Sequence, residues 1–127
     1  MRAILLTAIT LAAGGHPSSW YLRRNNALLR TVPVYPGARM YRREDDPAMT
    51  KNRVMSQLFF RFRGRVAFTP ILDYFTARMR SQCKPDTRGR GKDFVTLLCR
   101  NRTMSFFVNT VDLGHTEYVL EVQYIGP

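Results

Sequence analysis

Residues 94–125 read FVTLLCRNRTMSFFVNTVDLGHTEYVLEVQYI, and this stretch decides the fold. Apolar and polar residues alternate in three successive segments, which are Phe94–Arg100, Thr103–Asn109 and Thr116–Ile125. Side chains of a β-strand point alternately to the two faces of a sheet, so each segment has one apolar face to bury. Asn101-Arg102 fits a two-residue hairpin turn, and 112–115 fits a longer one. The stretch therefore predicts three consecutive antiparallel strands.

A helix just upstream is the expected cover for this sheet, because three strands with one apolar face need a second layer. Thr69-Pro70 fits a helix start, with Thr as the cap and Pro in the first helical position. Apolar residues then recur at helical spacing, namely Ile71, Leu72, Tyr74, Phe75 and Met79. The helix is expected to end near Cys83, because Pro85 cannot continue it.

Two shorter segments, residues 38–43 and 54–63, predict strands that precede the helix. Between them, Glu44-Asp45-Asp46-Pro47 is interpreted as a solvated acidic turn. A calcium site is the alternative, but consecutive acids in a loop rarely converge on one ion. The prediction is an α+β domain over residues 38–127, with a mostly antiparallel sheet of about five strands in the order ββαβββ and one helix packed on one face.

The first 15 residues predict a secretory signal peptide. Arg2 is followed by an uncharged run, residues 3–13, and then by Gly14-Gly15. The apolar run is too short to cross about 30 Å of hydrocarbon. Trp20-Tyr21 with Arg23-Arg24 also fits an interfacial belt, so an uncleaved membrane anchor stays an alternative, as does an ordinary buried helix. The sequence favours an extracytoplasmic protein, either secreted or anchored to the cytoplasmic membrane.

Residues 16–37 are interpreted as a short N-terminal helix and a Pro-rich connector. The connector contains Pro33, Tyr35, Pro36, Gly37 and Ala38, in which Pro36-Gly37 fits the centre of a type II turn. This P-x-Y-P-G-A segment, placed soon after an N-terminal apolar run, resembles small uncharacterised exported or membrane-anchored bacterial domains. The resemblance implies strands, one helix and a strand meander, and it implies no activity. The segment itself is expected to be a rigid turn that docks Tyr35 on the sheet edge.

The two cysteines, Cys83 and Cys99, are predicted to form a disulfide. Cys99 shares a strand face with Val95 and Leu97, and is therefore expected to point toward the helix that ends near Cys83. An exported protein favours disulfide formation, and a loop of this size gives about 3 kcal/mol in the chain-entropy treatment. Two unrelated buried thiols are the alternative. A zinc site is not expected, because there are too few ligands.

Positive charge is the main clue to a partner. The 127 residues carry 20 basic and 9 acidic side chains, a net charge of +11, which attracts the chain to anionic surfaces without choosing among them. Codon bias toward arginine is a competing explanation for the excess. The candidate anion-binding surface comprises Arg61, Arg63, Arg65, Arg88, Arg90 and Lys92. Residues 84–92 are interpreted as a mobile basic loop, with an anion cradle as the alternative.

Phe and Arg alternate from Phe60 to Arg63 within this strand, and in some nucleic-acid-binding proteins aromatic rings stack on bases while arginines hold phosphates. The competing interpretation makes Phe60 and Phe62 core residues and Arg61 and Arg63 an outer face. No catalytic motif is present, since Asp112 and His115 lie in one turn without a nucleophile. The sequence thus predicts a non-enzymatic exported or envelope-associated domain, without cofactor or metal, that binds an anionic membrane surface or an envelope protein. A cytoplasmic, basic nucleic-acid-binding domain is the alternative.

Overall fold

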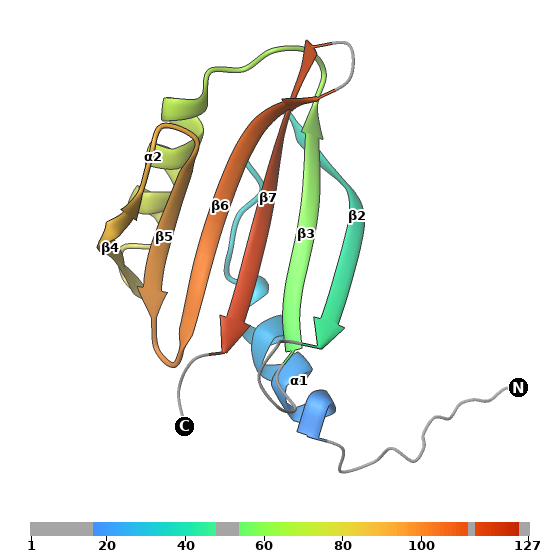
Figure 1. The fold of residues 1–127 in the computed structure, drawn as a ribbon, viewed down its shortest axis with the longest axis vertical. Coiled ribbons are helices and arrows are strands. Elements are labelled where there is room, and N and C mark those ends of the chain that lie inside the picture. The colour runs from blue at the N-terminus through green and yellow to red at the C-terminus, as the bar shows by residue number, and fades with distance from the viewer. Residues whose placement is uncertain (1–16, 48–53, 112–113, 125–127) are drawn as a thin grey trace, which may run out of the picture.

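The structure, a computed structural model, describes residues 17–47, 54–111 and 114–124. Its elements are α1 (Pro17–Leu29), β2 (Ala38–Pro47), β3 (Val54–Phe62), α2 (Phe68–Arg78), β4 (Cys83–Arg90), β5 (Phe94–Cys99), β6 (Arg102–Val111) and β7 (His115–Tyr124). The strands form one sheet of six in the order β2-β3-β7-β6-β5-β4, with antiparallel neighbours (Figure 1). The predicted α+β class is confirmed. The described part has six strands and two helices, against a predicted sheet of about five strands with one helix packed on it. The additional helix is α1, which lies where a short N-terminal helix was expected, but it packs on the sheet as part of the domain. The predicted signal segment, residues 1–15, lies outside the described residues.

Both described helices pack on one face of the sheet, behind it in Figure 1. α2 contacts β5 and β6, while α1 contacts β3 and β7. Fully buried side chains from α2 and the middle strands form the core between these layers, led by Phe75, Phe106, Tyr118, Leu120 and Val95. Phe75 stacks on Phe106 with 4.2 Å between ring centroids. The predicted covering role of α2 is therefore confirmed, and α1 extends the cover.

The start and end of α2 differ from the prediction. The residue before the helix is Ala67, which makes no side-chain capping hydrogen bond, and Pro70 lies in the third helical position. The expected Thr69 cap is thus wrong. α2 ends at Arg78, with Met79 as its C-cap. Cys83 therefore begins a strand and does not end the helix.

Strand β4 occupies the stretch that was expected to be a mobile basic loop. It pairs with β5 at Cys83–Cys99, Lys84–Leu98 and Pro85–Leu97, then becomes irregular before Arg90. Cys83 is its only buried residue, so β4 shows no apolar alternation that a sequence pattern could detect. Cys83 and Cys99 form the predicted disulfide between directly opposed residues, with a Cα–Cα distance of 4.2 Å. The bond ties this edge strand to the core.

The predicted acidic turn is also wrong, because β2 continues through Glu44 to Pro47 in register with β3. Residues two apart on a strand share a face, and here they pair as opposite charges. Arg42 lies 3.2 Å from Glu44, and Arg43 lies 3.0 Å from Asp45. These pairs lower the repulsion among the acids and allow an extended backbone.

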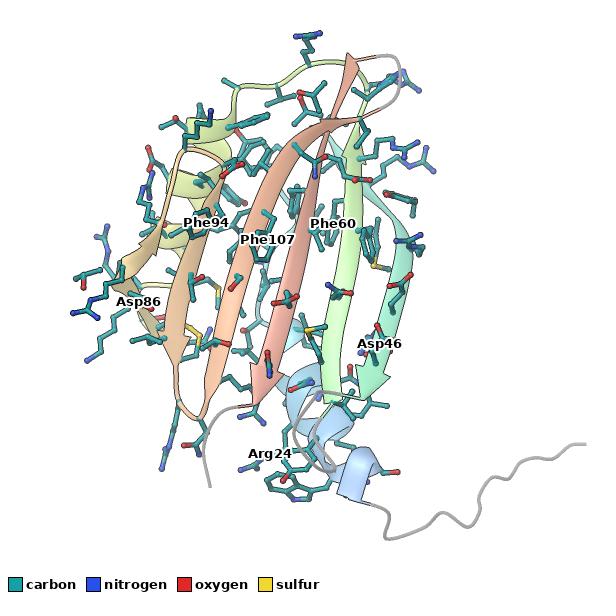
Figure 2. The ribbon with its side chains drawn as sticks, in the orientation of Figure 1. Arg24, Asp46, Phe60, Asp86, Phe94 and Phe107 are labelled. Atoms are coloured by element: carbon teal, nitrogen blue, oxygen red, sulfur yellow. A yellow bond between two sulfur atoms is a disulfide. The ribbon has the colours of Figure 1, made fainter. Side chains whose placement is uncertain are left out.

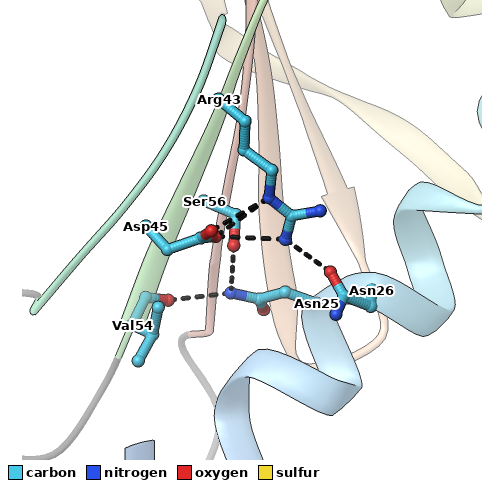
Figure 3. Close-up of polar contacts among 6 residues, drawn as sticks. All are labelled: Asn25, Asn26, Arg43, Asp45, Val54 and Ser56. Carbon is cyan, nitrogen blue, oxygen red and sulfur yellow. Dashed lines mark hydrogen bonds and ion pairs between the residues drawn. The ribbon is translucent and has the colours of Figure 1, made fainter. Parts of the chain in front are cut away.

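Polar contacts fasten α1 to the sheet (Figure 3). The fully buried Asn25 amide donates to the Val54 carbonyl oxygen at 2.9 Å and to Ser56 Oγ at 3.2 Å. Beside it, the Arg43 guanidinium bonds both Asn26 and Asp45. A buried carbonyl without a partner is costly, so these bonds specify where α1 docks on the ends of β2 and β3.

The Pro-rich connector contains the predicted turn. Gly37 has a φ of +89° and the Ala38 N–H donates to the Tyr35 carbonyl oxygen at 3.0 Å, as in a type II turn. Tyr35 packs edge-on against Tyr74 at 4.8 Å. Its own N–H donates to the hydroxyl of buried Tyr118 at 3.2 Å. Tyr35 therefore docks between α2 and the sheet rather than on the sheet edge.

Candidate functional site

The second face of the sheet has no described helix packed against it. An apolar row crosses this open face, because strand register places Phe59 beside Val119, Val119 beside Phe107, and Phe107 beside Phe94. Phe107 is 39% exposed. The Phe94 and Phe107 rings stack with centroids 6.2 Å apart, and both lie on the near side of the ribbon in Figure 2. The open face thus offers an aromatic strip to the surroundings.

A β-bulge shapes one end of this face. Met40 pairs with Phe60 and Arg42 pairs with Phe59, so Tyr41 is an extra residue in β2. A bulge of this kind redirects a side chain and strengthens the local twist. The Tyr41 hydroxyl donates to the Glu117 carboxylate on β7, two strands away in the sheet. The bulge therefore connects the edge strand to the centre of the open face.

Glu117 is a nearly buried carboxylate on this face, with 6% of its surface exposed. Burial raises the pKa of this carboxyl above its ordinary value. Arg61, its register partner, places its guanidinium 3.7 Å from the carboxylate and 4.6 Å from the centre of the Tyr41 ring. Tyr41, Glu117 and Arg61 therefore hold one another in place by a hydrogen bond, an ion pair and a cation–π contact.

A cavity of about 840 Å³ opens beside this group, a volume typical of ligand pockets. Its basic wall is made of Arg39, Arg61 and Arg63, and its other lining residues are Gly37, Ala38, Met40, Tyr41, Phe62 and His115. The Gly64 N–H anchors the His115 ring by donating to Nδ1 at 2.8 Å. Among the described residues, neither Arg39 nor Arg63 makes an ion pair. Two of the three guanidiniums in this basic wall thus have no ion pair within the described segments, while Arg61 is paired with Glu117.

The structure divides the six residues of the predicted anion-binding surface. Arg61 and Arg63 line the cavity, and Arg65 lies close by, against Gly114. Arg88, Arg90 and Lys92 lie on and just after β4, the opposite edge of the sheet. β3 and β4 are four strand spacings apart, roughly 19 Å. Arg90 is moreover paired with Asp73 at 2.8 Å. The two groups therefore do not form one surface.

Sequence reasoning missed the other members of the site. Arg39 lies within a segment correctly expected to be a strand, but nothing in the sequence places it opposite Arg61. The bulge at Tyr41 and the burial of Glu117 have no sequence signature of their own. The sequence around His115 indicates only a potential base in a turn. What unites these residues is the adjacency of β2, β3 and β7, which is a property of the topology.

Comparisons with known proteins add no relative: no family model, curated protein or solved structure matches the chain. Within residues 17–47, 54–111 and 114–124, no three potential metal ligands gather in one place. The helices of these segments are also too short or too polar to span a bilayer.

Proposed function

We propose that the chain is a non-enzymatic exported or envelope-associated domain that binds an anionic partner, either a membrane surface or the acidic region of an envelope protein. The observation that carries the proposal is the basic wall of Arg39, Arg61 and Arg63, in which Arg61 alone makes an ion pair with a carboxylate of the described part of the chain. Guanidinium groups favour carboxylate and phosphate partners because their planar forks donate two parallel hydrogen bonds.

Two further observations support an extracytoplasmic location. The N-terminal pattern of one arginine, a short apolar run and small residues is typical of a secretory signal. The disulfide between Cys83 and Cys99 is the kind of bond that persists in oxidising compartments. The resemblance of the P-x-Y-P-G-A segment to exported bacterial domains agrees with this proposal.

The test is co-sedimentation with vesicles of phosphatidylglycerol and phosphatidylcholine, compared with phosphatidylcholine alone. Binding to the anionic vesicles should weaken steeply with salt, because exposed charges are screened over about 8 Å at physiological ionic strength. The double variant Arg39→Glu/Arg63→Glu should lose most of the binding. Arg88→Glu/Lys92→Glu is the matched control, since it changes net charge equally at the opposite edge. A wild-type protein that ignores anionic vesicles at low salt would refute membrane binding.

Nucleic-acid binding is a second candidate, favoured by the aromatic strip of Phe59, Phe107 and Phe94 on the same face as the basic wall. Such strips stack on bases, at about 1–3 kcal/mol per base. Fluorescence anisotropy with a labelled single-stranded oligonucleotide tests it. Binding that Phe107→Ala weakens, together with no vesicle binding, would select this candidate over the first.

A further inference from the structure

Strand β2 forms one edge of the sheet, and no strand of the described part lies on its outer side (Figure 1). It is ten residues long. A long edge strand carries a row of unpaired backbone N–H and C=O groups, to which another chain can add a strand. The side chains of Arg42, Arg43, Asp45 and Asp46 are exposed along its second half. β2 therefore offers backbone hydrogen bonds and charges together to a partner.

The charges of β2 are divided along its length. Three basic residues come first and three acidic residues follow, namely Arg39, Arg42 and Arg43, then Glu44, Asp45 and Asp46. If two copies of this strand pair antiparallel, the basic half of each lies against the acidic half of the other. Charged side chains usually protect an edge strand from pairing. In this order they favour one pairing, which is the antiparallel pairing of β2 with itself.

The opposite edge of the sheet is protected where β2 is not. β4 carries three basic residues and one acidic residue, namely Lys84, Arg88, Arg90 and Asp86, so a second copy there would place cations against cations. Pro85 has no N–H to donate, and the strand is irregular between Pro85 and Arg90. β2 has balanced charges and no proline before its last residue. Like charge thus opposes association at β4, and opposite charge favours it at β2.

We propose that two copies of the chain associate through β2, which pairs antiparallel with itself about a two-fold axis at Glu44. Such an axis is perpendicular to the sheet and keeps the covered faces of both copies on one side. Residues directly opposite each other must then share a face. Segment 42–46, which follows the bulge, satisfies this condition. Arg42 lies opposite Asp46 and Arg43 lies opposite Asp45, and each of these pairs occurs twice.

The side chains of one copy already lie on the faces that this register requires. Arg42 lies over the Phe59 ring, 4.1 Å from its centroid, on the open face. Arg43 bonds Asn26 of α1 on the covered face. The paired segment begins after the β2 residues that line the anion cavity, so the inference does not depend on anion binding. In the dimer, both open faces and their basic walls point the same way.

Other registers are less favourable. In the proposed one, Glu44 meets Glu44, but Arg42 of its own chain lies 3.2 Å away and balances it. Asp46, which makes no ion pair in the described segments, gains one. An axis at Asp45 would place acids against acids. An axis at Arg43 would place arginine against arginine and extend the pairing into the bulge.

Sedimentation equilibrium of the full chain at physiological ionic strength tests the proposal. Salt at this level screens the repulsion between two positively charged chains beyond about 8 Å but acts less on neighbouring ion pairs. The molar mass should rise with protein concentration from one chain to two and no further, because a two-fold contact is closed. A chain that stays monomeric up to about 1 mM, or that grows beyond two copies, would overturn the proposal.

Complementary charge reversals locate the contact. Arg42→Asp and Asp46→Arg should each weaken association by about tenfold or more, because each turns two opposite-charge pairs of the dimer into like-charge pairs. An equimolar mixture of the two variants should restore association, since the reversed positions then meet with opposite charge. Neither substitution removes the Arg43 bond that fastens α1 to the sheet. A mixture that stays as weak as its components would overturn the pairing.

Lys84→Asp on β4 is the matched control. It should change the affinity by less than about twofold, since β4 lies five strand spacings from β2, roughly 24 Å. A loss equal to that of Arg42→Asp would show a general charge effect and overturn the contact at β2. Association that Phe107→Ala weakens and the β2 variants leave unchanged would place the contact on the aromatic strip, and would also overturn the proposal.

Hydrogen exchange of the wild-type chain gives a second test that needs no variant. When a dilute sample is compared with a concentrated one, amide protons of β2 should exchange more slowly in the dimer, because the new strand pairing protects them. Amide protons of β4 should be unchanged. Dimerisation that leaves exchange in β2 unaltered would overturn the assignment of the contact.

Discussion

Loss of the Cys83–Cys99 disulfide should destabilise the protein strongly and should do so first at one edge of the sheet. The bond spans a sequence separation of 16, for which the chain-entropy treatment gives about 3 kcal/mol. A domain of this size loses roughly 4 °C in Tm per kcal/mol, so reduction should lower Tm by roughly 10–15 °C. β4 pairs only with β5, and Cys83 is its one buried residue. Within the described residues, β4 is also joined to α2 by the Arg90–Asp73 ion pair, but both side chains are solvent-exposed and such pairs contribute little.

The assay compares three samples by thermal unfolding and by hydrogen exchange. These are the oxidised protein, the protein reduced with a phosphine, and the Cys83→Ala/Cys99→Ala variant. Reduction removes the bond and keeps both side chains, so any additional loss in the double variant measures packing. Amide protons of β4 should exchange faster on reduction, while those of β6 and β7 should change less. A reduced protein that melts within about 3 °C of the oxidised form would refute the reasoning.

Two further outcomes are expected. Phe75→Ala should cost about 3–5 kcal/mol in urea unfolding, because its ring is fully buried on Phe106, whereas Phe107→Ala on the open face should cost less than about 1 kcal/mol. Equal losses in the two variants would contradict the assignment of the covered and open faces. Since burial raises the pKa of Glu117 in the folded state, the native protein binds more protons than the unfolded chain just above pH 4.5. The free energy of unfolding should therefore fall as pH rises through this window, and Glu117→Gln should remove the contribution of Glu117 to that pH dependence. If the unfolding free energies of the wild type and Glu117→Gln changed in parallel with pH, Glu117 would make no such contribution.

Residues 94–124 were predictable because alternation there reflects real burial. Val95, Leu97, Met104, Phe106, Val108, Tyr118, Leu120 and Val122 all face the core. One face is buried and the other is open, which is the arrangement that produces a period of two. The same logic correctly placed Phe60 and Phe62 in the core and Arg61 opposite them. It also placed Cys99 on the core side, where the disulfide is found.

The edges of the sheet were not predictable in this way, because edge strands bury little. β4 is polar along its length, and the second half of β2 is a run of charges. β4 is a strand because it pairs with β5 and is joined to it by the disulfide. The second half of β2 is a strand because it pairs with β3 and because its arginines and acids form ion pairs. None of these interactions produces a periodic pattern of apolar residues in the sequence. The bulge at Tyr41 depends on how β2 aligns with β3. The residues of β2 alone therefore do not predict it.

The location of the candidate site follows from this division between core and edge. Residues that form the core lie on the covered face, whereas Arg39 and Arg63 are exposed at the edge of the open face and contribute nothing to that core. The Tyr41–Glu117 bond ties the edge to β7, a central strand, and so gives an edge site a rigid base. A mobile edge would lose affinity through ordering on binding, whereas this one is ordered beforehand. Tyr41→Phe should therefore weaken ligand binding and lower stability by about 1–3 kcal/mol, because the ring beside Arg61 is kept while the hydrogen bond to the nearly buried Glu117 carboxylate is lost.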